Sequence, residues 1–521
     1  MTKLLQYKII HPPPHNQLFN NHAFTSSSDD EPVLVPGRYI VVFKDQGERE
    51  VSEQAAQRAA ELTESVISDL NIRQDSLIHR YRYSLKGFSA RLSEEQAEVL
   101  KQDSRIKLVV QDFRYKAIQS SFFPLATQKT MGDTIPEPIP QIIPWGVERV
   151  GGPFNGTGKR AWVLDTGIKL NQSELNVDTQ NAENFVIHES QDDLNGHGTF
   201  VAGVIAAIDN DRGVVGVAAG ATVVPVKVCD QGGFCLASEV NAGIDYVAAN
   251  FAPGDVANMS LAWPLGHPAI NMNLAVLEGN IETAASAGLR FTIAAGNDMA
   301  HAEDYSPARI THQNVWTLSS ISEGDNLSYS FTCPENNHEG TNGGAPPIDY
   351  AAPGNEIKSY ASSSTDITTA CGTSFAAPHM AGLLLTEPNG IGTDGFTGYD
   401  AFGSQHPIVA FMPTLSAPYI FASVYDNYYP RISWSTVAYA DNYRVYRRID
   451  QGSWQYIGQV SNPPFTDYTQ GTSNLSVIFS PPANGQDYLS YRVKAAASGL
   501  DNSPNSNTVY FSTSGFCNPC Q

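Results

Sequence analysis

Short apolar segments alternate with segments of helical periodicity between residues 144 and 412. Strands are predicted at 161–164, 222–228, 256–259, 290–295 and 315–321, and helices fall between them. Apolar strands that alternate with helices are typical of a parallel sheet covered on both faces. The sequence therefore predicts an α/β domain, with its reactive side chains at the carboxyl ends of the strands.

Three short motifs place polar residues at the ends of these predicted elements. Asp165-Thr166-Gly167 directly follows the strand at 161–164. Residues 195–199 (NGHGT) open one helix, and residues 372–379 (GTSFAAPH) open another. Each motif contributes one candidate catalytic residue, and these are Asp165, His197 and Ser374.

The three residue types suit acyl transfer. A serine hydroxyl is too weak an acid to ionise alone near neutral pH, so Ser374 needs an imidazole such as His197 to take its proton. The imidazole needs a carboxylate such as Asp165 to fix its tautomer and stabilise its cation. The N-terminus of the helix at Ser374 would direct unpaired N–H groups at the oxyanion. Asn297, which ends an apolar strand, would add a side-chain amide donor.

These motifs, in the order Asp165, His197, Ser374, resemble those of the subtilisin family of serine peptidases, particularly its proteinase K-like branch. The resemblance implies an endopeptidase that hydrolyses peptide bonds through an acyl-enzyme. It also implies that one segment pairs with the substrate backbone and that another lines the side-chain pocket. The residues concerned are Ser260, Leu261 and Ala262 in the first segment, and Ala294, Ala295 and Gly296 in the second.

Residues 36–116 have a different pattern, in which two helices lie among four short strands. The order β-α-β-β-α-β predicts an α+β, ferredoxin-like sandwich. This segment resembles the inhibitory propeptide of the family, of the inhibitor I9 type, and implies a self-processed zymogen with its own propeptide as an intramolecular inhibitor. Residues 1–35 are then an N-terminal extension. Residues 117–143 are a proline-containing linker, and the maturation cut is expected within it.

Residues 413–512 lose helical periodicity, and apolar and polar residues alternate with period two. This pattern, with turns rich in proline, glycine and asparagine, predicts an all-β sandwich. Trp434 fits the core tryptophan of an early strand, and the domain resembles fibronectin type III. Residues 513–521 form a tail with Cys517 and Cys520.

Charge and hydropathy exclude several classes of partner. The net charge of −21 opposes binding to nucleic acid or anionic lipid. No apolar run approaches the roughly 20 residues of a membrane-spanning helix. Protein or peptide substrates are expected, and the chain is expected to be a monomer.

The six cysteines suggest an oxidising compartment, although residues 1–10 contain no apolar core of a secretory signal. Cys229 and Cys235 bracket a short loop and are expected to pair, whereas Cys333 and Cys371 remain unassigned. A secreted, extracellular protein is therefore expected. No cofactor is expected to be required for catalysis. The resemblance implies that structural calcium is possible, because calcium is common in the family. No carboxylate spacing in this sequence is diagnostic of a calcium site, so metal ligands stay unassigned.

Two rival hypotheses deserve comparison. An aspartic protease needs two carboxylates that share a proton, and only one DTG motif occurs. The alternative from another class is a catalytically silent protein that binds a polymer or cell surface through its β-sandwich, for example through Tyr425, Tyr428 and Tyr429. The complete set of catalytic motifs favours the enzyme.

Overall fold

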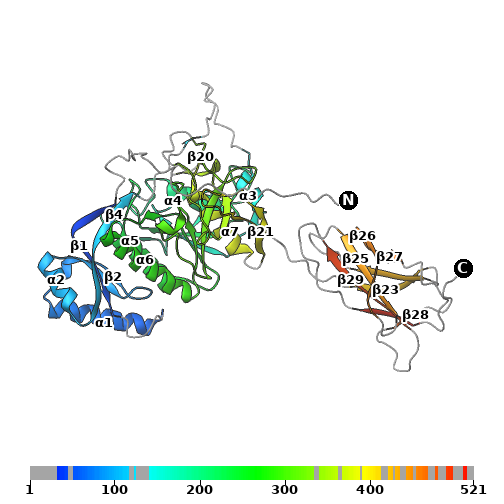
Figure 1. Cartoon of the computed structure of the whole chain (residues 1–521), viewed down its shortest axis with the longest axis horizontal. Coiled ribbons are helices and arrows are strands. Elements are labelled where there is room, and N and C mark those ends of the chain that lie inside the picture. The colour runs from blue at the N-terminus through cyan, green and yellow to red at the C-terminus, as the bar shows by residue number, and fades with distance from the viewer. Residues whose placement is uncertain are drawn as a thin grey trace, which may run out of the picture.

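The computed structural model of the 521-residue chain forms three parts along the sequence (Figure 1). They are the N-terminal domain, the central domain and the C-terminal strands. The structure describes residues 32–44, 51–116, 123–124, 140–333, 339–361, 367–387, 390–411, 420–425, 429–434, 442–449, 453–466, 476–478, 488–496 and 508–512. The tail with Cys517 and Cys520 and most of the predicted linker lie outside these residues.

The N-terminal domain has the predicted β-α-β-β-α-β order. Its elements are β1 (Val33–Phe43), α1 (Glu53–Asp69), the 3-10 turn Gln74–Ser76, β2 (Leu77–Tyr81), β3 (Gly87–Arg91), α2 (Glu94–Gln102) and β4 (Ile106–Lys116). The sheet is antiparallel in the order β4-β1-β3-β2. The strand β1 begins three residues before the predicted domain boundary at 36.

Local signals explain both helices of this domain. Ser52 caps α1 by accepting a hydrogen bond from the Ala55 N–H. Ser93 and Gln96 form a capping box at the start of α2, in which each side chain bonds the backbone of the other residue. The helices pack against the sheet around Val41, Val66 and other buried apolar residues.

The central domain is built on the predicted parallel sheet. Its strands follow the order β21-β22-β18-β17-β15-β13-β7-β11-β8, with β9 also paired to β11. These strands are β7 (Arg160–Asp165), β8 (Asn176–Val177), β9 (Glu183–Asn184), β11 (Thr222–Lys227), β13 (Val256–Met259), β15 (Arg290–Ala294), β17 (Val315–Ile321), β18 (Tyr350–Pro353), β21 (Ile391–Phe396) and β22 (Pro407–Phe411). Only the edge pair β21–β22 is antiparallel.

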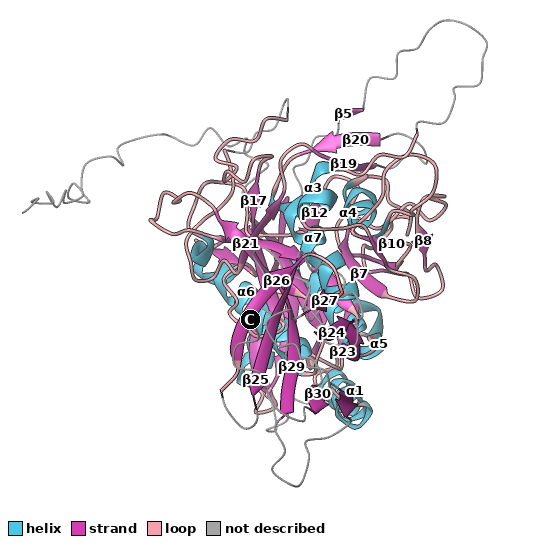
Figure 2. Ribbon diagram, turned by 90° about the vertical axis from the view of Figure 1, so that its right-hand side faces the viewer, coloured by secondary structure: helices cyan, strands magenta, loops and turns pink. Residues whose placement is uncertain are grey.

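Helices cover both faces of this sheet, as Figures 1 and 2 show. On β7, Trp162 and Leu164 pack towards α5 (Ala237–Asn250) and α6 (Pro268–Ser286), whereas Ala161 and Val163 pack towards α4 (His197–Ala206) and α7 (Thr373–Thr386). Burial on both sides explains why the strand has no polar face. Strands and helices were therefore predictable here from apolar runs and helical spacing.

Short elements complete the central domain. They are α3 (Trp145–Arg149), the 3-10 turn Ala302–Asp304, and the strands β5 (Phe123–Pro124), β6 (Phe154–Asn155), β10 (Ala218–Ala219), β12 (Phe234–Leu236), β14 (Trp263–Pro264), β16 (Tyr305–Ser306), β19 (Ile357–Tyr360) and β20 (Ile367–Ala370). Disulfides join Cys229 to Cys235, as predicted, and Cys333 to Cys371. No described helix is long and apolar enough to cross a membrane.

The C-terminal strands form two antiparallel sheets. One contains β23 (Ile420–Tyr425), β24 (Tyr429–Trp434) and β27 (Phe465–Thr466). The other has the order β26-β25-β29-β30-β28, formed by β25 (Asn442–Ile449), β26 (Gln455–Val460), β28 (Ser476–Ile478), β29 (Tyr488–Ala496) and β30 (Val509–Ser512). Trp434 is buried in their common core, as predicted. The side chains of Tyr425, Tyr428 and Tyr429 lie outside the described part of the chain.

Candidate active site

Asp165 and His197 meet at the carboxyl edge of the central sheet. Asp165 is the last residue of β7, and His197 is the first residue of α4. The His197 Nδ1 lies 2.8 Å from Asp165 Oδ1 and 2.9 Å from Oδ2, and both side chains are fully buried. The carboxylate therefore holds Nδ1 and leaves Nε2 as the nitrogen that is directed at a reaction partner.

Asp193 fixes the loop that carries His197. Its carboxylate accepts hydrogen bonds from the Gly196 N–H at 2.8 Å, the Thr166 hydroxyl at 2.9 Å and the Thr199 hydroxyl at 2.6 Å. Burial raises the pKa of Asp193, although these donors oppose the rise. The sequence analysis missed this residue, because one Asp in a polar loop gives no signal until its partners are assembled.

The same junction requires a glycine after the histidine. A Cβ atom at Gly198 would lie 2.0 Å from the Gly167 carbonyl oxygen. The first turn of α4 therefore packs directly against the backbone of the Asp165-Thr166-Gly167 motif. This contact explains the glycine at 198, whereas Gly167 has a φ of 100°, a left-handed conformation that favours glycine.

Ser374 lies in the first turn of α7, where a backbone N–H has no intrahelical partner. Its hydroxyl donates to the Ser260 carbonyl at 3.3 Å, and its own carbonyl accepts from the Ser260 hydroxyl at 2.6 Å. Pro378 lacks the N–H that would otherwise reach this carbonyl, so Ser260 takes its place. Among the described residues, His197 Nε2 has no hydrogen-bond partner, so the serine–histidine bond is not formed in this structure.

Asn297 is held in a single orientation by Thr373. Its Oδ1 accepts from the Thr373 N–H and from the Thr373 hydroxyl, both at 2.9 Å. Its amide nitrogen is thereby directed away from Thr373. A Cβ atom at Gly372, whose φ is 146°, would lie 3.4 Å from this nitrogen, so the glycine keeps the space beside the amide open.

The sequence analysis predicts that Asn297 is an oxyanion donor, so its replacement by alanine is expected to lower kcat by roughly 10²–10³ and to leave KM within about twofold. That magnitude was measured on subtilisin and is transferred here. Thr373→Ala should cost less, since the Thr373 N–H still holds Asn297. Steady-state kinetics with a chromogenic peptide distinguish the two variants. An equal loss of kcat in Asn297→Ala and Thr373→Ala would contradict the predicted role of the Asn297 amide as a donor.

A small cavity of about 30 Å³ joins the predicted substrate-binding residues to Ser374. Ser260, Ala262, Ala294, Gly296 and Asn297 line it together with Ser374. Leu261 and Ala295 are fully buried in apolar clusters and do not line it. Four of the six predicted substrate-binding residues therefore lie around the serine.

The end of the N-terminal domain reaches this cavity. Tyr115 and Lys116, the last residues of β4, also line it. The strand β4 pairs antiparallel with β12, where Tyr115 lies opposite Cys235 and Lys116 opposite Phe234. The strand β12, which the sequence analysis did not identify, is therefore a sheet edge that receives an extended peptide beside Ser374.

The N-terminal domain packs beside α5 (Figure 1), and two polar contacts hold it there. The carboxylate of Asp245 accepts backbone N–H groups from four successive residues, namely Arg82, Tyr83, Ser84 and Leu85. The buried guanidinium of Arg38 bonds Asp112 at 2.7 Å and Glu239 at 3.2 Å. Two buried carboxylates thus share one cation.

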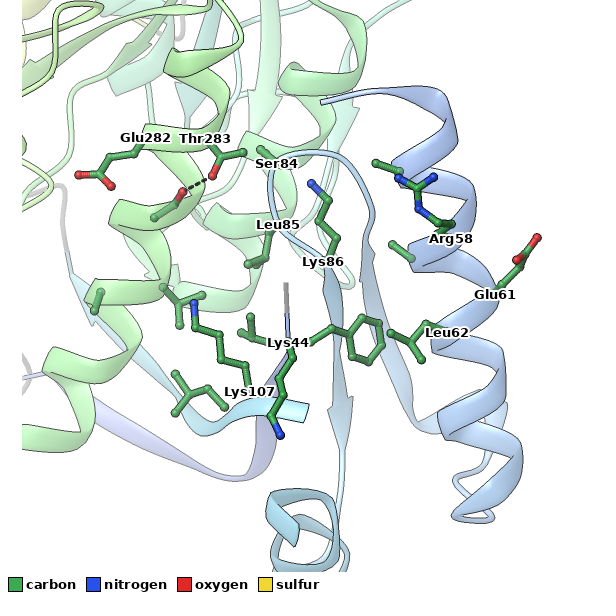
Figure 3. Close-up of a pocket in the computed structure, with 18 of the residues that line it drawn as sticks. Lys44, Arg58, Glu61, Leu62, Ser84, Leu85, Lys86, Lys107, Glu282 and Thr283 are labelled. Atoms are coloured by element: carbon green, nitrogen blue, oxygen red, sulfur yellow. Dashed lines mark hydrogen bonds between the residues drawn. The ribbon is translucent and has the colours of Figure 1, made fainter. Parts of the chain in front are cut away.

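A second, larger cavity lies away from Ser374. It has a volume of about 630 Å³ and lies between α1, the N-terminal sheet and α6 (Figure 3). Its lining combines apolar side chains such as Leu62, Leu85 and Val276 with the bases Lys44, Arg58, Lys86 and Lys107. Asp165, His197, Asn297 and Ser374 do not line it, and its lining comes from both domains.

Within the ranges that the structure describes, no group of three or more His, Cys, Asp or Glu side chains is placed to hold a metal ion. The structural calcium that the family resemblance implies stays a prediction, and its ligands stay unassigned.

Family comparisons agree with this geometry. Residues 161–386 match the subtilase family, and residues 38–117 match peptidase inhibitor I9. The chain is 31% identical over 365 residues to alkaline serine exoprotease A of Vibrio alginolyticus, covering 67% of this chain and 60% of that protein. It is also 31% identical over 374 residues to the extracellular serine proteinase of Thermus sp. (strain Rt41A), covering 68% of this chain and 80% of that protein.

A solved structure of a cold adapted subtilisin-like serine proteinase shares 31% identity, with 46% of this chain and 82% of that chain covered and a TM-score of 0.38. The chain therefore spans three fifths of the Vibrio protein's length and four fifths of the Thermus protein's length. The chain belongs to the subtilase family of subtilisin-like serine endopeptidases and carries a peptidase inhibitor I9 domain on its N-terminal side.

Proposed function

We propose that the chain is a zymogen that hydrolyses peptide bonds through Asp165, His197 and Ser374. The observation that carries the proposal is the position of β4, whose last residues lie along β12 and line the cavity of Ser374. An extended segment of the chain itself thus occupies the place of a substrate. The adjoining linker, residues 117–143, is the expected site of self-cleavage.

In the proposed mechanism, the Ser374 hydroxyl turns from the Ser260 carbonyl towards His197 Nε2 and attacks the scissile carbonyl carbon. His197 takes the serine proton and later delivers it to the leaving amine. Asp165 stabilises the imidazolium that forms between these steps. Water then hydrolyses the acyl-enzyme: His197 takes a proton from the water and later delivers it to the Ser374 oxygen.

The oxyanion would be bound by two donors. The Asn297 amide nitrogen is held in place by Thr373, and the Ser374 N–H belongs to the first turn of α7. Both donors are fixed before the reaction, so little reorganisation is needed when the negative charge develops. The backbone of Ser260–Ala262 would flank the substrate opposite β12, and Ala294 and Gly296 would line its side-chain pocket.

Several finer assignments follow as parts of the proposal. The motif set supports the proteinase K-like branch, and the two antiparallel sheets around Trp434 support a fibronectin type III-like domain. Two disulfides support secretion, as does the extracellular relative from Thermus. Catalysis by these residues needs no cofactor, and the chain is proposed to act as a monomer.

The shared cation at the interface predicts a pH dependence of inhibition. Burial, opposed by Arg38 and reinforced by Asp112, raises the pKa of Glu239 to about 8. A carboxyl whose pKa is higher in the complex takes up a proton when the propeptide binds, so this contribution to binding is lost as the pH rises through 8. The Ki of the cleaved propeptide is therefore expected to rise between pH 6.5 and 8.

The window starts at pH 6.5 because burial lowers the pKa of His79 to about 3 in the complex, which weakens binding at lower pH. Asp112 and Asp245 also have pKa values raised by burial and act in the same direction as Glu239. Glu239→Gln should flatten the rise, whereas Glu148→Gln, exposed on α3, should not. The Ki is obtained from the activity recovered on dilution, normalised to the activity of propeptide-free enzyme at each pH. If the Ki of Glu239→Gln rises with pH as steeply as that of the wild type, protonation of Glu239 is not the cause.

The proposal as a whole is tested with Ser374→Ala. This variant should neither hydrolyse a chromogenic peptide nor shorten its own chain. A silent surface-binding protein would instead show no hydrolysis in the wild type either.

A further inference from the structure

One face of the five-stranded C-terminal sheet carries a cluster of positive charge. The strands β25 and β29 are paired so that Arg444 lies opposite Lys494 and Tyr446 lies opposite Arg492. The intervening residues, such as Val445 and Val493, are fully buried in the core between the sheets. The cations therefore project from the outer face, which we call the cationic face and define by Arg444, Arg448, Arg492 and Lys494.

Aromatic rings hold two of these cations in place. The guanidinium carbon of Arg492 lies 4.2 Å from the ring centre of Trp454, and that of Arg448 lies 4.9 Å from it. Arg492 also lies over the ring of Tyr446, at 5.7 Å, and Tyr446 contacts Tyr456 edge to face. A stacked guanidinium keeps its N–H edge free for hydrogen bonds while its plane is fixed.

Among the described residues, no acid compensates the charge of the cationic face. Within the described part of the chain, none of its four cations forms an ion pair, although the whole chain has a net charge of −21. The Nε atoms of Arg448 and Arg492 are buried and have no hydrogen-bond partner among described residues. Burial lowers the pKa of Arg492, and neighbouring Arg448 adds to this effect. Like charges are thus held together, and an anion would relieve their repulsion.

We infer that the cationic face binds an anionic polysaccharide, through carboxylate or sulfate groups. Guanidinium groups whose planes are fixed present paired N–H donors that match these anions. Tyr456, which is 57% exposed, offers an apolar ring beside them for a sugar. A single-stranded nucleic acid fits less well, because it needs open ring faces for its bases, whereas two guanidinium groups lie against Trp454. This binding role goes beyond the proposed peptidase function and does not depend on it.

The test uses the full chain with Ser374→Ala as background, so that self-cleavage does not remove the domain. Isothermal titration at low salt with polygalacturonate and with heparin should show binding, and dextran should not bind. Arg444→Gln/Lys494→Gln should raise Kd at least about tenfold, since two contacts to anions are lost. Arg448→Lys/Arg492→Lys keeps the charge but loses the paired donors, and should also weaken binding.

The matched control is Lys159→Gln/Lys358→Gln, which removes the same charge from the central domain and should leave Kd within about twofold. Thermal unfolding checks that each variant is folded. The inference is overturned if the parent binds neither polyanion, if the control weakens binding as much as Arg444→Gln/Lys494→Gln, or if a single-stranded oligonucleotide binds more tightly than both polysaccharides. Binding of one polyanion only would identify carboxylate or sulfate as the recognised group.

Discussion

Replacing Ser374 by alanine is expected to lower kcat for peptide hydrolysis by about 10⁶. The magnitude is known from subtilisin, a relative, and the structure gives the reason for transferring it. Two hydroxyl groups from the first turn of α7 line the cavity beside Asn297, and they belong to Thr373 and Ser374. The Thr373 hydroxyl is already bonded to Asn297, so only that of Ser374 can act as the nucleophile. No other described side chain is placed to act as its substitute.

The variant must be shown to fold, because a misfolded chain would also be inactive. A thermal unfolding midpoint close to that of the wild type serves this purpose. Ser286→Ala, at the exposed end of α6, is the matched control and should keep full activity. Turnover by Ser374→Ala within tenfold of the wild type would rule out the assigned nucleophile.

Replacing Asp165 by asparagine is expected to lower kcat by about 10⁴, with a small change in KM. The Thr166 N–H donates to Asp165 Oδ1 at 2.7 Å, so in the variant the amide oxygen is expected at that position. The amide NH₂ would then face His197 Nδ1 and donate to it. Nδ1 would become an acceptor and Nε2 would carry the proton, so the base would be lost although the side chains keep their places.

A neighbouring carboxylate provides the control for this second variant. Asp192 pairs with Lys169 and accepts a hydrogen bond from the Leu170 N–H. Asp192→Asn removes the same charge and should change kcat by less than about threefold. Stopped-time assays with one chromogenic peptide give both values. A similar loss in the two variants would show that net charge rather than the histidine tautomer is responsible.

The sequence alone predicted the elements and residues whose causes are local. The strand at 315–321 has the bounds of β17, and the second helix predicted in residues 36–116 is α2, which a capping box at Ser93 begins. Asp165, His197 and Ser374 were predicted as catalytic residues because each lies in a motif at the end of an element. Such signals arise from burial and backbone geometry within a few residues.

Features that depend on distant partners were missed. The strand β4 reaches Lys116 because β12, more than 100 residues later, pairs with its end. Its polar residue Asp112 is buried only because Arg38 and Ser238 reach it. Cys333 was likewise left without a partner until the fold brought Cys371 to it. No periodicity within a segment can indicate such contacts.

The central claim is that Ser374 cleaves the chain's own linker while β4 lies along β12. The most direct measurement is the intact mass and N-terminal sequence of the purified wild-type chain and of Ser374→Ala, expressed side by side. The account predicts a new N-terminus between residues 117 and 143 in the wild type and none in the variant. An uncut wild type, or the same cut in both proteins, would contradict it.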